Sequence, residues 1–214
     1  MQASMQNVAV DAATIRLQHF NGRKRPVGWM VREAFEGCPL IPVNGRRFVL
    51  NALTEQIPAT SPELLRDAAR WVAEVADFSR ATKIAGEEDK GAVLVAATAL
   101  LVDLPFGLAR WQPSGLPGQI KVPFECEYTS GDLYLNGVEP HDKVVIVDDV
   151  ISTGGTMVSL IEAIRECGGE IVDVVCVAEK SAYRGVERVR DETGIAIKTL
   201  LKLDLSGATS AVVD

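Results

Sequence analysis

The sequence predicts an α/β fold in which helices flank a parallel-sheet core. Continuous apolar runs, which are typical of strands buried on both faces, include Lys143–Val147 and Glu170–Ala178. Segments with the apolar spacing of helices alternate with these runs, and such alternation predicts a parallel sheet. The chain has 214 residues, of which 47% are hydrophobic, and this is enough for one domain that buries a substantial core.

The first 60 residues carry the weakest pattern. Residues 1–28 are polar, and we expect them to form a loosely held N-terminal extension. A short helix is predicted at Met30–Phe35, and Asn44-Gly45 then predicts a hairpin turn before the apolar run that starts at Phe48. This partly β segment, about 29–60, is too small to bury a core of its own.

The first long helix is predicted to begin at Thr60–Glu63, where a hydroxyl, a proline and an acid provide start signals. Apolar residues recur at helical spacing after it, which gives one buried face. The chain then predicts a strand at Lys83–Glu87, a buried helix at Gly91–Val102 and a strand at Leu104–Ala109. Length and alanine content favour a helix rather than a strand for the second of these.

The C-terminal part continues the alternation. The strand at Lys143–Val147 leads to a predicted helix at Gly155–Cys167, which Gly168-Gly169 ends. Strands at Glu170–Ala178 and Ile195–Leu205 complete the predicted sheet. In contrast, prolines and glycines interrupt any pattern between Trp111 and Gly137, so we expect a long loop there, and long loops in compact domains are functional or disordered.

Bulk composition excludes several classes of function. A net charge of −7 argues against a broad basic face for nucleic acid. The four cysteines form no CxxC pair and there are two histidines, so a zinc site or a Ser-His-Asp triad is hard to build. No run reaches the roughly 18 apolar residues of a membrane span, and the N-terminus lacks a secretory pattern. We therefore expect a cytoplasmic protein with reduced thiols and no membrane partner.

One stretch, VVIVDDVISTGGT from Val144 to Thr156, has the features of a binding site. Ligands of parallel sheets bind beyond the carboxyl ends of the strands, which is where this stretch lies. The residues that can present backbone N–H groups, hydroxyls and a helix N-terminus to one phosphate are Ser152, Thr153, Gly154, Gly155 and Thr156. Because no lysine follows the glycines, the stretch is not the GxxxxGK[ST] type, and no GxGxxG is present either.

The acids Asp148 and Asp149 would repel a polyphosphate, but they can accept hydrogen bonds from the two hydroxyls of a ribose. A phosphate at one end and a diol at the other describe a ribose 5-phosphate. Two alternatives remain: solvated acids beside a flexible glycine turn, and an acidic pair that binds magnesium.

This stretch resembles the phosphoribosyl-pyrophosphate signature of the type I phosphoribosyltransferases. The resemblance extends from about Met30 onward, and GLPGQIKV and TSGDLYLNGV are similar to the archaeal-type hypoxanthine and adenine enzymes of the purine branch. It implies a type I phosphoribosyltransferase fold for residues 29–214. That domain would include a small hood at about 29–60, a mobile loop at about 111–137 and assembly as a homodimer.

The resemblance also implies roles for individual residues. Asp148 and Asp149 would hold the ribose hydroxyls, and through the sugar donor they would contact Mg²⁺ only indirectly. Residues Ser152 to Thr156 would hold the 5-phosphate. The residues expected at the pyrophosphate are Glu88, Asp89, Lys90, Gly91 and Arg110, and Lys121 is a second basic candidate from the mobile loop. Trp111 stands where the family often has a basic residue.

Two further residues are expected near the base. Glu127, in a Glu-Tyr pair like that of adenine-type enzymes, is expected to be catalytic together with Asp149, and a solvated loop acid is the alternative. Lys180 lies roughly where purine enzymes read the exocyclic group of the base, and the alternative is a surface lysine at a strand end. Ser152 replaces the acid of the animal 6-oxopurine enzymes, as it does in the archaeal-type branch.

The function that the resemblance implies is purine salvage. The enzyme would transfer the ribose 5-phosphate of phosphoribosyl pyrophosphate to adenine, hypoxanthine or guanine, with Mg²⁺ as cofactor and with the nucleoside monophosphate and pyrophosphate as products. The alternatives are an orotate-type or other non-purine transferase, suggested by Lys90-Gly91, and a non-catalytic regulator that senses the sugar donor.

Overall fold

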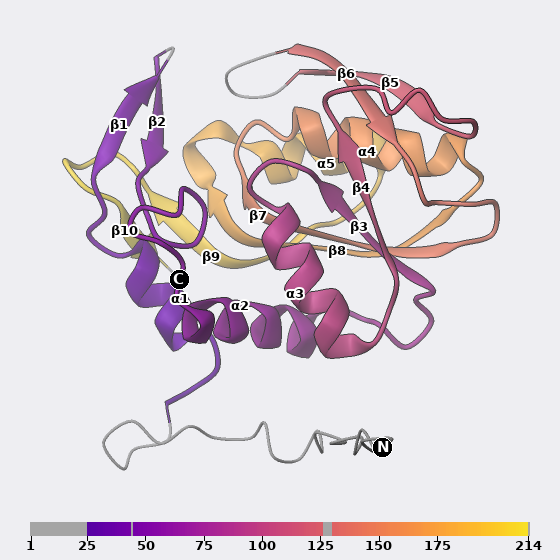
Figure 1. Ribbon diagram of the computed structural model, residues 1–214. Coiled ribbons are helices and arrows are strands. Elements are labelled where there is room, and N and C mark those ends of the chain that lie inside the picture. Colours follow the sequence, from indigo (N-terminus) through magenta and orange to yellow (C-terminus); the bar gives the residue numbers. More distant parts are fainter. Residues whose placement is uncertain (1–24, 44, 126–129, 214) are drawn as a thin grey trace, which may run out of the picture.

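The computed structural model describes residues 25–43, 45–125 and 130–213 (Figure 1). Its centre is an eight-stranded sheet with the strand order β10-β9-β8-β7-β3-β4-β6-β5. Strands β9, β8, β7, β3 and β4 run parallel, whereas β10, β6 and β5 are antiparallel to their neighbours. The predicted α/β fold with a parallel core is therefore confirmed.

The elements of the first part are α1 (Trp29–Phe35), β1 (Leu40–Val43), β2 (Arg46–Val49), α2 (Pro62–Val75), β3 (Lys83–Glu87), α3 (Ala92–Val102) and β4 (Phe106–Arg110). Those of the second part are β5 (Ile120–Glu125), β6 (Ser130–Leu135), β7 (Lys143–Ile151), α4 (Gly155–Glu166), β8 (Glu170–Lys180), the 3-10 helix η1 (Ser181–Tyr183), α5 (Gly185–Thr193), β9 (Lys198–Asp204) and β10 (Ala211–Val213). Among the described residues, no helix is both long enough and apolar enough to cross a bilayer.

Alternate residues of β7 build two separate cores, one on each face of the sheet. Val145 and Val147 pack into a cluster with apolar residues of α1, α2 and α3. Val144 and Ile146 pack into a second cluster with α4, α5 and the β5–β6 hairpin. Because successive strand residues point to opposite faces, an all-apolar strand requires a cover on both sides, and Figure 1 shows helices on both.

Helix α2 anchors the start of the domain. Its N-cap Ser61 accepts a hydrogen bond from Leu64 N (3.1 Å), as the start signals predict. From the same helix, Asp67 accepts hydrogen bonds from Gly28 N (2.9 Å), Met30 N (2.9 Å) and Val31 N (3.3 Å). The carboxylate thus caps α1 and fixes the end of the expected N-terminal extension, of which residues 1–24 lie outside the described residues.

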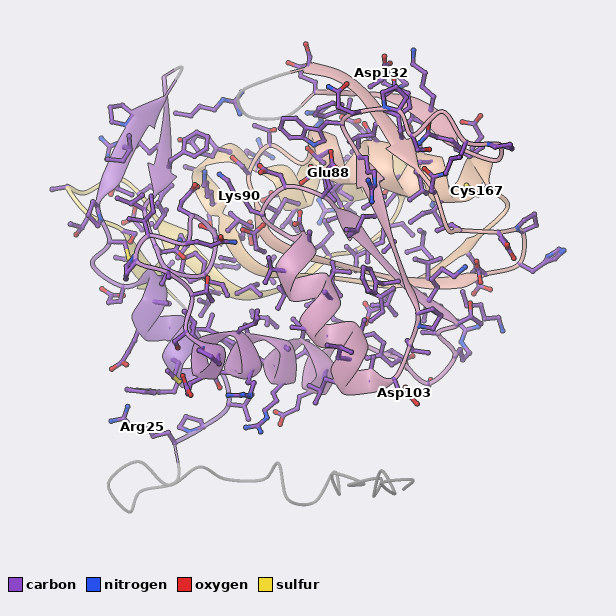
Figure 2. All side chains as sticks on the ribbon, viewed as in Figure 1. Arg25, Glu88, Lys90, Asp103, Asp132 and Cys167 are labelled. Atoms are coloured by element: carbon purple, nitrogen blue, oxygen red, sulfur yellow. The ribbon has the colours of Figure 1, made fainter. Side chains whose placement is uncertain are left out.

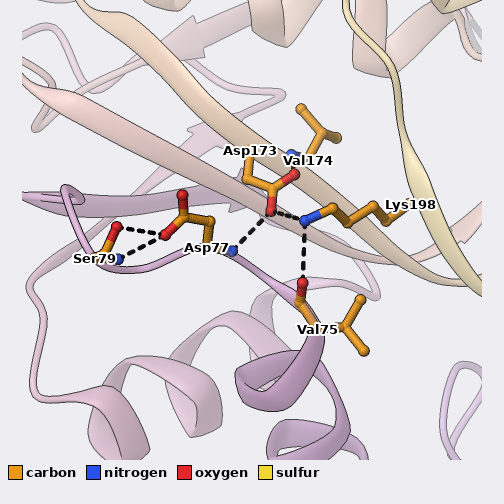
Figure 3. Close-up of polar contacts among 6 residues, drawn as sticks. All are labelled: Val75, Asp77, Ser79, Asp173, Val174 and Lys198. Atoms are coloured by element: carbon orange, nitrogen blue, oxygen red, sulfur yellow. Dashed lines mark hydrogen bonds and ion pairs between the residues drawn. The ribbon is translucent and has the colours of Figure 1, made fainter.

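Polar contacts close the amino end of the sheet, opposite the end where ligands are expected (Figure 3). Asp173 of β8 accepts hydrogen bonds from Asp77 N (2.8 Å) and from Lys198 Nζ (2.6 Å). Lys198 also donates to Val75 O (3.1 Å) at the end of α2. These contacts fasten the α2–β3 connection to β8 and β9, so the carboxyl ends are left for the site.

The prediction of a long loop between Trp111 and Gly137 is wrong for most of that segment, because the structure contains an antiparallel hairpin there. Strands β5 and β6 pair from Ile120–Leu135 to Glu125–Ser130 and extend the sheet beyond β4. The sequence pattern hid this because β5 is an edge strand, where Pro123 is tolerated. Ser159 Oγ of α4 donates to Pro123 O (2.8 Å) and fastens the hairpin to the domain.

Smaller differences occur near the C-terminus. Helix α5 was not predicted, because it is strongly polar and buries only Gly185, Val189 and Thr193. Strand β9 begins three residues later than expected, at Lys198, and the short strand β10 was also missed. The predicted hairpin at Asn44-Gly45 is confirmed by the antiparallel pairing of β1 and β2.

Candidate active site

One pocket collects most of the residues that the sequence singled out. It opens at the carboxyl ends of β3, β7 and β8, and the hairpin β1–β2 with the turn after it forms one wall. The described residues that line it are Phe48, Val49, Thr54, Glu55, Glu87, Asp89, Lys90, Trp111, Lys180 and residues 148–157. This position agrees with the rule for ligand sites of parallel sheets.

The loop at residues 152–156 lines the pocket and leads into the N-terminus of α4. Gly154 has φ +78° and is the N-cap of α4, so the loop turns directly into a helix whose first N–H groups have no partner within the helix. The hydroxyl Oγ of Ser152 is buried and has no hydrogen-bond partner among the described residues. A buried polar atom of this kind indicates a ligand or water contact, since an orphan donor costs free energy.

The glycines of this loop allow close packing from behind. A Cβ atom on Gly154 would lie 2.6 Å from the carbonyl oxygen of Gly185, the first residue of α5. A Cβ on Gly155 would collide with the carbonyl oxygen of Glu125, at the end of β5. The loop is thus held between the hairpin and α5, two elements that the sequence pattern did not predict.

The acid pair lies beside this loop, where β7 ends. Asp149 is 5% exposed and its Oδ2 has no hydrogen-bond partner among the described residues, while its backbone N donates to Asp148 Oδ1 (2.9 Å). Burial raises the pKa of Asp149 to about 6. Burial and then the neighbouring Asp149 charge raise the pKa of Asp148 well above its usual value. Donors from a ligand, such as a pair of hydroxyls, would relieve this cost.

The loop after β3 brings Asp89, Lys90 and Gly91 to the acid pair. Gly91 approaches Asp148 so closely that a Cβ atom on the glycine would collide with Asp148 Oδ1. Lys90 Nζ donates to Glu55 Oε1 (2.5 Å) and lies 4.8 Å from the centre of the Phe48 ring. Figure 2 shows Lys90 between the β1–β2 hairpin and the sheet.

The other residues expected at the pyrophosphate do not line the pocket. Glu88 Oε1 accepts a hydrogen bond from Trp111 N (2.8 Å), so it positions the tryptophan rather than facing a ligand. Arg110 is exposed at the end of β4. Lys121 pairs with Asp132 across the hairpin (3.0 Å), and it is also exposed. Glu127, which was expected near the base, lies outside the described residues.

Lys180 is buried, so the alternative of a surface lysine is wrong. It is 5% exposed at the end of β8 and lines the pocket. Its Nζ lies 4.6 Å from the centre of the Phe48 ring and 6.0 Å from that of Tyr183. Aromatic faces attract an ammonium group, so these two rings favour the position of Lys180 at the pocket.

Sequence reasoning missed several pocket residues. Glu87 is 8% exposed, and burial together with the Asp89 charge raises its pKa to about 7. It appeared only as the last residue of a predicted strand. The hairpin residues Phe48, Thr54 and Glu55 were missed too, because no local pattern says which side of the sheet a small β segment covers.

Five carboxyl groups but only two ammonium groups line the described pocket. The carboxyls are those of Glu55, Glu87, Asp89, Asp148 and Asp149. An anionic ligand therefore needs additional positive charge, which a divalent cation bound with it can supply. Within the described residues, no three His, Cys, Asp or Glu side chains are grouped so as to hold a metal ion. A cation brought in on the oxygens of the ligand fits this set better than one held by the protein alone.

Comparisons with known proteins show which families and structures the chain is similar to. A family model described as the phosphoribosyl transferase domain matches residues 59–200. The hypoxanthine/guanine phosphoribosyltransferase of Methanocaldococcus jannaschii is 39% identical over 176 residues, which cover 82% of this chain and 95% of that protein.

Solved structures show the same fold. The adenine phosphoribosyltransferase of Rhodothermus marinus is 29% identical, with a TM-score of 0.66 over 80% of this chain and 95% of that one. The enzyme of Giardia lamblia complexed with 9-deazaadenine is 23% identical, with a TM-score of 0.70 over 84% of this chain and 98% of that one.

Proposed function

The chain belongs to the phosphoribosyltransferase family, and from this premise we propose that it is a purine phosphoribosyltransferase of nucleobase salvage. The observation that carries the proposal is the single pocket that joins the acid pair Asp148 and Asp149, the 152–156 loop and Lys90. A diol, a phosphate ester and a second anionic group in one molecule describe phosphoribosyl pyrophosphate.

The donor is held at three points in this proposal. Asp148 and Asp149 accept hydrogen bonds from the ribose hydroxyls, and the residues of the 152–156 loop with the N-terminus of α4 bind the 5-phosphate. Asp89, Lys90 and Gly91 face the pyrophosphate. Glu88 acts on this group through Trp111, and Arg110 reaches it only if the 111–137 segment closes over the pocket. The proposal also includes the hood at 29–60 and the closure of the 111–137 segment over the pocket.

Mg²⁺ is the proposed cofactor. It would be held chiefly by oxygens of the donor, with Asp148 and Asp149 contacting it indirectly through the ribose hydroxyls, and when bound it neutralises the charge of the leaving pyrophosphate. The excess of carboxyl groups over ammonium groups in the pocket supports a requirement of this kind.

The reaction is a displacement at C1 of the ribose. The bond from C1 to the pyrophosphate oxygen breaks, a bond from C1 to a purine nitrogen forms, and both electrons of the broken bond leave with pyrophosphate. The chain contributes mainly by positioning and electrostatics, because the transition state is loose. Asp149 or Glu127 takes the proton that the base nitrogen loses.

Lys180 is proposed to contact the base. The named relatives act on hypoxanthine and guanine or on adenine. An ammonium donor suits the oxygen of a 6-oxopurine better than the amino group of adenine, because an ammonium group cannot accept a hydrogen bond. We therefore propose hypoxanthine and guanine as the preferred bases.

The partners proposed are the donor, a nucleobase and a second copy of the chain. Helix α3 is apolar on all sides and exposes Val93, Leu100 and Leu101, and a homodimer would bury apolar surface there. The described cysteines Cys38, Cys167 and Cys176 are free thiols, which favours the reducing cytoplasm as the location.

The experiment that tests the function measures pyrophosphate release from purified protein with Mg²⁺, phosphoribosyl pyrophosphate and one base at a time. The bases are hypoxanthine, guanine, adenine, xanthine, orotate and uracil. We expect release with purines, fastest with hypoxanthine or guanine, and none from the variant carrying both Asp148→Asn and Asp149→Asn. Release with orotate alone would overturn the purine assignment, and donor binding without release on any base would favour a sensor.

A further inference from the structure

The ion pair between Glu55 and Lys90 connects two walls of the pocket that come from different parts of the chain. Glu55 lies in the turn after β2, on the hairpin wall of the pocket, whereas Lys90 lies in the loop after β3. Their side chains are 23% and 26% exposed, and Lys90 Nζ lies 2.5 Å from Glu55 Oε1. Both residues line the pocket.

The position of Glu55 is set by a buried turn. Asn51, which is 2% exposed, accepts hydrogen bonds from Leu53 N (2.8 Å) and Thr54 N (3.0 Å) through Oδ1. Its Nδ2 donates to Thr54 Oγ1 (2.8 Å) and Val49 O (3.2 Å). Asn51 therefore fixes the backbone next to Glu55, so the carboxylate is presented to the pocket by a rigid support and not by a free loop.

Lys90 is held from the same wall by a second group. Its Nζ lies 4.8 Å from the centre of the Phe48 ring, and the Nζ of Lys180 lies 4.6 Å from that same centre. The hairpin thus contacts both ammonium groups of the described pocket, one on the pyrophosphate side and one on the base side. Glu55 is the carboxylate of this wall that pairs with Lys90.

We propose that Glu55 competes with the pyrophosphate group of the donor for Lys90. In the ligand-free chain Glu55 holds the Lys90 ammonium at the hairpin wall. When the donor binds, its pyrophosphate oxygens take the ammonium, and the tie between the hairpin and the loop after β3 is released. When pyrophosphate is to leave, Glu55 takes Lys90 back. Glu55 is therefore a positioning residue that acts through Lys90, and this inference rests on the proposed function.

The competition has a measurable cost for binding. A pyrophosphate that must displace a carboxylate from Lys90 gains less from that contact than one that finds the ammonium available. Glu55→Gln keeps the shape of the side chain and removes the charge, so it should tighten pyrophosphate binding and slow its release.

The test is a double-mutant cycle on pyrophosphate binding, measured by calorimetry with Mg²⁺ on the full chain. We expect Glu55→Gln to lower the Kd for pyrophosphate by about fivefold, because one partly exposed charge pair no longer has to be broken. The KM for phosphoribosyl pyrophosphate should fall in parallel, while kcat should not rise. In a Lys90→Met background, the Gln substitution should leave the Kd unchanged. Glu63→Gln is the matched control, because it removes the same charge from an exposed position on α2.

Two outcomes would overturn the inference alone. The first is that Glu55→Gln changes the Kd equally with and without Lys90, which would indicate direct repulsion between Glu55 and pyrophosphate. The second is that Glu55→Gln binds pyrophosphate more weakly than the wild-type chain, which would mean that the ion pair stabilises the binding site. Unfolding curves identify a variant that has lost its fold. If Glu55→Gln does not fold, Glu55→Ala replaces it in the cycle. If the wild-type chain binds neither pyrophosphate nor the donor, the proposed function itself fails.

Discussion

The carboxylate oxygen Oδ1 of Asp148 occupies the space that a Cβ atom on Gly91 would need. Gly91 has φ −66° and ψ −26°, a right-handed helical conformation that any residue adopts. The glycine is therefore required for the close approach of two loops and not for its backbone angles. Through this contact the proposed pyrophosphate loop and the proposed ribose-binding acid share one wall.

The first prediction concerns this contact. Gly91→Ala should lower kcat/KM for phosphoribosyl pyrophosphate by about 10- to 100-fold, because the added methyl group displaces Asp148 from its position, and small displacements of positioning groups are costly. Some loss of stability should accompany this change, because Gly91 is the N-cap of α3, a position at which glycine is preferred to alanine. Gly207→Ala is the control, because a Cβ there meets no atom closer than 3.4 Å. Full activity in Gly91→Ala would contradict the packing argument.

The second prediction separates binding from stability at Ser152. Its buried hydroxyl has no partner among the described residues, so Ser152→Ala should leave the unfolding free energy unchanged or raise it. The KM for the donor should nevertheless rise by about tenfold, since one charge-assisted hydrogen bond to the 5-phosphate is lost.

The contrast for Ser152 is Ser159, whose Oγ bonds to Pro123 O (2.8 Å) and Gly155 O (3.1 Å). Ser159→Ala should destabilise the fold by about 1 kcal/mol, as expected for a satisfied hydrogen bond. Urea unfolding of both variants, with donor kinetics, checks the pair. A destabilised Ser152→Ala would mean that the hydroxyl serves the fold.

The third prediction concerns the base. Lys180→Met should raise the KM for hypoxanthine and guanine by about 10- to 100-fold. The KM for the donor should change much less, because the contact that is lost is to the base alone. Steady-state kinetics with each substrate varied in turn measures this. Lys202→Met, at an exposed position on β9, is the control. An equal effect on both substrates would assign Lys180 to the structure of the pocket.

The sequence predicted the parts of the site that depend on local pattern. The acid pair and the glycine loop follow a strand directly, so their place at the carboxyl end could be predicted from the run of Val144 to Val147 alone. Lys90 and Gly91 were expected from the family resemblance instead, which implies a pyrophosphate loop after the strand at Lys83–Glu87.

The parts that were missed depend on tertiary packing. Glu55 and Phe48 reach the pocket because the β1–β2 hairpin folds over the sheet, and no spacing encodes that placement. Helix α5 supports the phosphate loop through the contact of Gly185 with Gly154, although its own apolar content is small. Arg110 was expected at the pyrophosphate from the family resemblance, but strand β4 exposes its side chain. Its proposed role therefore needs movement that spacing cannot predict.

The fourth prediction concerns α3 as the surface for a second copy. Leu100 is 86% exposed on a helix that has no polar face. Leu100→Glu should shift the chain from dimer to monomer in sedimentation experiments, because a charge replaces apolar surface that a dimer would bury. Leu116→Glu, at another exposed leucine outside α3, is the control. A wild-type chain that sediments as a monomer would remove the homodimer from the proposal.

The last prediction follows from the buried acid Glu87, whose pKa is raised to about 7 by burial and by Asp89. In the unfolded chain this carboxyl should have its ordinary pKa of 4.5. Between these two values the folded chain binds more protons than the unfolded chain, so the contribution of Glu87 to stability falls as the pH rises. The difference corresponds to about 3 kcal/mol when the carboxyl is fully ionised.

The glutamine of Glu87→Gln cannot ionise, so this variant does not lose stability in this way as the pH rises. Relative to the wild-type chain, the variant should gain free energy of unfolding as the pH rises from 5 to 8, with most of the gain between about pH 5 and 7. Urea unfolding at several pH values, with Glu63→Gln as an exposed control, measures the difference. Parallel curves for the wild-type chain and Glu87→Gln would mean that the carboxyl is solvated in the ligand-free protein. A gain confined to Glu87→Gln would show that the pocket holds a carboxyl at a cost in stability, which is expected where charge is arranged for a ligand rather than for the fold.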